Sequence, residues 1–71
     1  MTQEQYEAMQ ELETEIISNY IVAYKALETI RNIAFHKGLR EVSNEAKIAQ
    51  MALENTMSMT GYKDRVLSQI K

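Results

Sequence analysis

Apolar residues in the first half of the chain recur every three or four positions without a break. They are Met9, Leu12, Ile16, Tyr20, Ala23, Leu27, Ile30 and Ala34. This spacing places them on one stripe of an α-helix. The chain has no proline to interrupt such a helix, and its two glycines, Gly38 and Gly61, come after the stripe. The pattern therefore predicts one long helix and favours an all-α fold.

Capping residues indicate where this first helix begins and ends. Thr2 followed by Gln5 has the spacing of a capping box, in which each side chain bonds the backbone of the other residue. Gly38 stands where helices commonly end in a left-handed residue. We therefore expect the first helix to span residues 3–37, a length of roughly 50 Å.

The second half of the chain carries signals for two shorter helices. Ser43 is a typical N-cap residue, and Gly61 interrupts the apolar pattern that follows it. We expect helices at residues 44–59 and 62–70, with a break or kink near Gly61. The sequence thus predicts a single helical domain over residues 1–71, in which the long helix and a shorter second arm form an antiparallel helical hairpin.

The charges are distributed unevenly along this hairpin. Residues 1–24 hold five glutamates and no lysine or arginine. Folding back would bring this acidic half near Lys63, Arg65 and Lys71. Exposed ion pairs contribute about 0–1 kcal/mol each, so we expect them to select the orientation of the arms rather than to hold the arms together.

A chain of 71 residues has little room for a core, because a domain of this size buries only about 60% of the surface of its unfolded form. Disulfides, metals or oligomerisation often stabilise such domains, and this chain has no cysteine. Apolar residues also flank the main stripe on both sides, more than a single arm can cover. We therefore expect a homo-oligomeric bundle. The predicted interface residues are Ile17, Ile21, Val22, Tyr24, Ile33 and Phe35.

The inventory of reactive side chains argues against an enzyme. The chain has one histidine, His36, no cysteine and no Gly-x-Ser-x-Gly motif. Leu39 and Arg40 occupy the positions where a second metal ligand would follow His36 on a helix. Glycines are too few for a phosphate-binding or dinucleotide-binding loop. We expect no catalytic residue, no metal and no cofactor.

Targeting signals and charge narrow the function further. The start of the chain is polar and acidic, the opposite of a secretion signal. The most apolar stretch, residues 16–33, is interrupted by charged residues and falls short of a membrane span. The basic residues are dispersed and are outnumbered by the acidic ones, 8 to 10, unlike the basic patch of a duplex DNA binder. We expect a cytoplasmic protein that enters no membrane and binds no duplex DNA.

An aromatic ring beside cations can bind a nucleotide, because the ring stacks on the base while the cation meets the phosphate. Tyr24 offers such a ring, and Lys25, Arg31 and Lys47 offer the cations. These four are the candidate ligand-binding residues. Tyrosines at helical spacing are also common core residues, and this alternative stays open for Tyr24 on the flank of the stripe.

The run from Ser43 to Glu54 resembles the helical hairpin of phage anti-CBASS sponge proteins. The matching residues are Ser43, Glu45, Ile48, Ala49, Leu53 and Glu54. The chain differs from that family in lacking a tryptophan in the second helix and a proline in the loop. The resemblance implies a small helical oligomer that sequesters cyclic oligonucleotide signals in pockets between its subunits, and that blocks bacterial antiphage signalling without chemistry.

The wide apolar helical face supports a second hypothesis. Such a face can pack into the groove of a macromolecular partner or join it in a bundle. The chain would then be a protein-protein interaction module, such as a phage inhibitor or an assembly adaptor that binds a host protein. Under either hypothesis the protein binds and does not catalyse, and further copies of the chain are its first expected partner.

Overall fold

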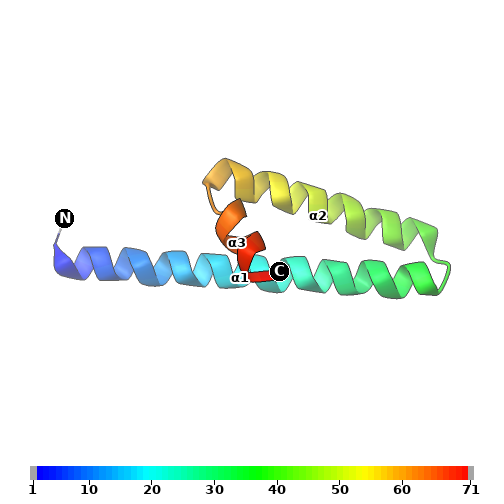
Figure 1. Cartoon of the computed structure of the whole chain (residues 1–71), viewed down its shortest axis with the longest axis horizontal. Coiled ribbons are helices and arrows are strands. Elements are labelled where there is room, and N and C mark those ends of the chain that lie inside the picture. Colours follow the sequence, from blue (N-terminus) through cyan, green and yellow to red (C-terminus); the bar gives the residue numbers. More distant parts are fainter. Residues whose placement is uncertain (1, 71) are drawn as a thin grey trace.

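A computed structural model describes residues 2–70, and this part of the chain is helical with no strand. The elements are α1 (Gln3–His36), α2 (Arg40–Thr60) and α3 (Lys63–Ile70). Figure 1 shows α2 running back alongside the second half of α1, with α3 turning in to lie against the middle of α1. The all-α prediction is confirmed.

The first helix begins where the capping box predicts. The Thr2 hydroxyl accepts a hydrogen bond from the Gln5 backbone N–H (3.2 Å), and the Gln5 side-chain oxygen accepts one from the Thr2 backbone N–H (3.0 Å). At the other end Gly38 is left-handed (φ 73°), and the Leu39 N–H donates to the Ala34 carbonyl oxygen (2.8 Å). This last bond satisfies a carbonyl that the helix end would otherwise leave unpaired.

The start of the second helix differs from the prediction. α2 begins at Arg40, directly after Leu39, and not at residue 44 behind a Ser43 cap. The turn at Gly38 reverses the chain direction, and α2 follows it directly. The Ser43 N–H donates to the Leu39 carbonyl oxygen (3.0 Å), which is a helical hydrogen bond. The Ser43 hydroxyl donates instead to the Arg31 carbonyl oxygen on α1 (3.4 Å). The predicted start of the second helix at residue 44 is therefore wrong, and the connection between the first two helices is shorter than expected.

The predicted break at Gly61 is confirmed. Gly61 is left-handed (φ 83°), and the Tyr62 N–H donates to the Met57 carbonyl oxygen (2.9 Å), which closes α2. α3 then begins at Lys63, one residue later than expected. The turn sends α3 back toward α1, where it helps to form the core.

The core lies where the three helices meet. Ile17 of α1, Met57 of α2 and Val66 of α3 are each less than 5% exposed. The partly buried residues packed around them are Tyr20, Ile21, Tyr24, Leu53, Tyr62 and Ile70. Ala34 and Ala46, both nearly fully buried, continue the contact toward the turn. α3 thus completes a core that the two longer helices alone would leave open.

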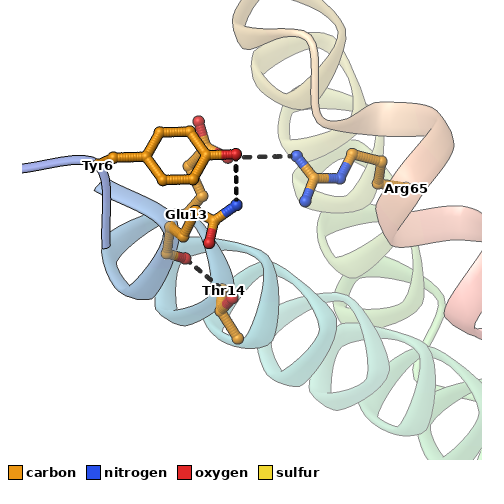
Figure 2. Close-up of polar contacts among 5 residues, drawn as sticks. Tyr6, Glu13, Thr14 and Arg65 are labelled. Atoms are coloured by element: carbon orange, nitrogen blue, oxygen red, sulfur yellow. Dashed lines mark hydrogen bonds and ion pairs between the residues drawn. The ribbon is translucent and has the colours of Figure 1, made fainter. Parts of the chain in front are cut away.

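One ion pair links α3 to α1, as the uneven charge distribution predicted for Arg65. The Arg65 guanidinium lies 3.6 Å from the Glu13 carboxylate, and Figure 2 shows it reaching across to α1. The same guanidinium lies over the Tyr62 ring, 5.9 Å from its centroid. Both charged side chains are largely exposed, so the pair contributes little stability. Lys71, which was expected to join this cluster, lies outside the described residues.

The molecule is elongated, with extents of 54 × 18 × 17 Å. Its radius of gyration is 15.2 Å, whereas a compact domain of this length has about 11 Å. Residues 3–12 of α1 are all exposed, and Figure 1 shows this segment projecting beyond α3 with no helix beside it. A large share of α1 is therefore uncovered.

Candidate functional site

The four predicted ligand-binding residues do not converge on one site within the chain. The Tyr24 hydroxyl donates a hydrogen bond to the Glu54 carboxylate (3.0 Å), and the Arg31 guanidinium donates to the side-chain oxygen of Gln50 (3.3 Å). Both therefore bond α1 to α2. Lys25 and Lys47 are exposed, and neither forms an ion pair within residues 2–70.

Buried Gln50 connects the two bonded residues. Its side-chain N–H donates to the Tyr24 carbonyl oxygen (3.4 Å) while its oxygen accepts from Arg31. Gln50 is only 4% exposed, and an unsatisfied amide there would cost about 1–3 kcal/mol. The Tyr24–Gln50–Arg31 contact is thus a structural connection between helices, which the apolar periodicity gave no means of predicting.

The environment of Tyr24 keeps its hydroxyl protonated. The hydrogen bond to Glu54 raises the pKa of the Tyr24 hydroxyl above its usual value, and burial and the negative charges of Glu54 and Glu28 act in the same direction. Arg31 opposes the shift. The Tyr24 ring packs against the core, which is the alternative that the sequence left open for this residue.

The predicted interface residues divide into two groups. Ile17 is buried in the core of its own chain, and Ile21 and Tyr24 pack against that core. Contacts inside the chain account for these three. Val22, Ile33 and Phe35 are exposed by 64%, 51% and 73% of their surface. Only this second group is free to contact another molecule.

Two of the exposed members, Val22 and Ile33, belong to a longer apolar stripe on α1. We define the outer stripe as five exposed residues: Leu12, Val22, Ala26, Ile30 and Ile33. At about 100° per residue they lie within an arc of about 80° on the helix. Leu12 and Ile30 belong to the main stripe of the sequence pattern, and periodicity alone does not show which part of a wide apolar surface the second arm covers.

The second helix carries an exposed apolar set of its own. Ile48, Met51 and Met59 are 57%, 60% and 81% exposed. Methionine is flexible and polarisable, and it recurs on surfaces that adapt to protein partners. We refer to these three residues as the α2 outer set.

The balance of exposed and buried apolar side chains is unusual for an isolated domain. Within residues 2–70, twelve large apolar side chains are at least 45% exposed, whereas five apolar residues, two of them alanines, are buried. The accessible surface is 5586 Å², while a compact monomer of this mass has about 4,500 Å². The excess of about 1,000 Å² exceeds the roughly 800 Å² that each partner buries in a standard protein interface.

A surface hollow with a volume of 440 Å³ lies at the turn between α1 and α2. It is lined by Phe35, Gly38, Arg40, Ser43 and Asn44, which were not predicted to share a site. The hollow combines an aromatic ring with a guanidinium. Every one of these side chains except Ser43 is exposed, so the hollow is a surface feature rather than an enclosed site.

Within residues 2–70 no three histidine or acidic side chains gather in a way that could hold a metal ion. In the same part of the chain, each helix is too short or too polar to cross a bilayer.

Comparisons of the chain with protein-family models, with curated proteins and with solved structures gave no match.

Proposed function

We propose that this chain is a non-catalytic helical interaction module, which assembles with itself and binds other proteins through exposed apolar helix faces. One observation carries the proposal: the described residues leave more than twice as many large apolar side chains exposed as they bury in the core. Large exposed apolar surfaces commonly mark protein interaction sites.

The distribution of this surface favours helical partners. The outer stripe follows one side of α1, and the α2 outer set lies on a different helix. Straight apolar stripes with helical spacing pack best against other helices, because ridges of side chains fit between those of the partner. A groove or helix of another protein would cover either surface in the same way.

The cyclic oligonucleotide sponge stays a second hypothesis, resting on the resemblance of residues 43–54. Tyr24 and Arg31 are held by bonds to α2, so a nucleotide would have to use the exposed cations Lys25 and Lys47, or Phe35 and Arg40 at the turn. Titration calorimetry with cyclic dinucleotides and trinucleotides tests this hypothesis. Saturable binding that a Lys47→Ala variant weakens would support a ligand site, and absence of heat would remove it.

Thermal unfolding tests the interaction proposal. If association stabilises the chain, the melting temperature rises with protein concentration, because only the folded state associates. We expect Val22→Glu to lower the melting temperature and to abolish its concentration dependence. Asn32→Glu is the matched control, since it adds the same charge to an exposed position of the same helix outside the outer stripe.

A melting temperature that is independent of concentration in the unmodified chain would contradict self-association. If Val22→Glu and Asn32→Glu lowered the melting temperature equally, the added charge, and not the lost apolar contact, would be the cause. A Met51→Glu variant applies the same comparison to the α2 outer set.

A further inference from the structure

We propose that α1 pairs with α1 of a second copy, antiparallel, through the outer stripe and with Ala26 on the two-fold axis. This inference rests on the proposed function, because it specifies how the chain assembles with itself. The occupant of the stripe is thus a second copy of this chain, and its own α1 is the contacting element.

The spacing of the outer stripe fixes the register. In an antiparallel pair centred on Ala26, residues at equal distances before and after Ala26 lie opposite one another. Val22 then meets Ile30 of the second copy, each four residues from the axis and thus about 6 Å from it. Ala26 meets its own counterpart, where a small side chain allows close approach of the helices. Moving the axis by two residues, which shifts the pair by about one helical turn, would instead set Ile33 opposite Glu15 or Val22 opposite the buried Ala34.

Charge complementarity selects the antiparallel direction. The same register places Glu15 opposite Lys37 of the second copy, since both lie eleven residues from Ala26. More broadly, the first half of α1 holds only acidic charges, whereas Lys25, Arg31 and Lys37 lie in or just after its second half. A parallel pair would oppose acid to acid, which is unfavourable in close helix pairs.

The projecting end of α1 fits this arrangement. Residues 3–12 have no helical neighbour in their own chain. In the proposed register, Leu12 lies level with residue 40 of the second copy, beside the exposed Leu39 and Val42. A hollow of 340 Å³ lined by Leu39 and Val42 is present at that turn. Leu12 would therefore approach this apolar turn, while residues 3–11 would extend beyond the second copy.

The area available agrees with a stable dimer. The excess exposed surface of about 1,000 Å² per chain is close to the roughly 800 Å² per partner that a standard interface buries. In a two-fold pair of long helices, both chains use the same surface patch. The dimer therefore covers the outer stripe of each chain and leaves neither stripe free to bind a third copy.

A single cysteine at the axis tests the register directly. The chain has no cysteine of its own, so an Ala26→Cys variant carries only one thiol. Because a residue on a two-fold axis meets itself, mild oxidation or a short bis-maleimide should convert most of the Ala26→Cys protein into a covalent dimer. Asn32→Cys, exposed on another side of α1, should remain largely uncrosslinked. Adding Val22→Glu to Ala26→Cys should suppress the crosslink.

A charge exchange provides the second test. Glu15→Lys and Lys37→Glu should each weaken the dimer, by about fivefold in dissociation constant, because the pair occurs twice in a two-fold dimer. The double variant, which restores opposite charges, should regain most of the affinity. Sedimentation equilibrium on the full chain measures all four proteins.

The outcomes separate this inference from the proposed function. An associated chain in which Ala26→Cys crosslinks no better than Asn32→Cys, and in which the double variant recovers nothing, would overturn the α1 pairing and leave self-association standing. A chain that stays monomeric throughout would overturn both.

Discussion

Replacing Met57 by alanine probes the core that joins the three helices. Met57 is fully buried and packs with Ile17 and Val66. Truncating a buried methionine to alanine costs about 2–5 kcal/mol, through lost burial and the cavity left behind. A chain of this size has a total stability of about 4–11 kcal/mol. Met57→Ala should therefore remove about a fifth or more of the stability.

The matched control lies two residues further along the same helix. Met59 is 81% exposed, so Met59→Ala should change stability by no more than about 0.5 kcal/mol. Far-UV circular dichroism melts at low protein concentration, where association contributes least, give both values. Met57→Ala should lower the melting temperature by at least about 10 °C. If Met57→Ala and Met59→Ala have the same melting temperature, Met57 does not belong to the core.

Three further predictions concern single contacts. The pKa of Tyr24 is raised, so its bond to Glu54 stabilises the fold below about pH 10, and this stability is lost as the pH rises through the folded-state pKa. In an absorbance titration, one tyrosine should therefore ionise at a higher pH than a model tyrosine. Tyr24→Phe should remove this high-pH ionisation. Gly61→Ala should lower the free energy of unfolding by about 1–2 kcal/mol, because Gly61 is left-handed (φ 83°) and alanine is strained in that conformation. An added Cβ meets no atom within 4 Å, so backbone strain is the sole expected cause. An unchanged denaturation midpoint would refute it. Arg65→Ala should cost no more than about 1 kcal/mol, and high salt should reduce the difference, since the pair with Glu13 is exposed.

The helix ends show what local sequence determines. The capping box at Thr2 and the left-handed glycine at position 61 act through bonds within a few residues, and both were predictable from spacing. The start of α2 was not, because Leu39 has no side-chain acceptor to mark it. Ser43 has the chemistry of a cap, yet tertiary contact directs its hydroxyl to Arg31 on α1.

The exposed apolar surface of α1 shows what the spacing of apolar residues cannot predict. Apolar spacing correctly indicates that α1 has more apolar surface than one arm covers, but it assigns no residue to a particular neighbour. α3 folds against α1 and buries Ile17, so a residue expected at an intermolecular contact became part of the core. Leu12 and Ile30 belong to the main stripe of the sequence pattern, yet the structure leaves both exposed. Only the packing of all three helices decides these assignments.

Native mass spectrometry of the purified full chain tests the central claim most directly, because one spectrum reports the assembly state and any tightly bound small molecule. The chain has a mass of 8.2 kDa. The account predicts a dimer or a higher even multiple for the unmodified protein and for Asn32→Glu, and a monomer for Val22→Glu. A monomer in all three spectra would contradict the claim that the exposed apolar faces of α1 and α2 bring copies of this chain together.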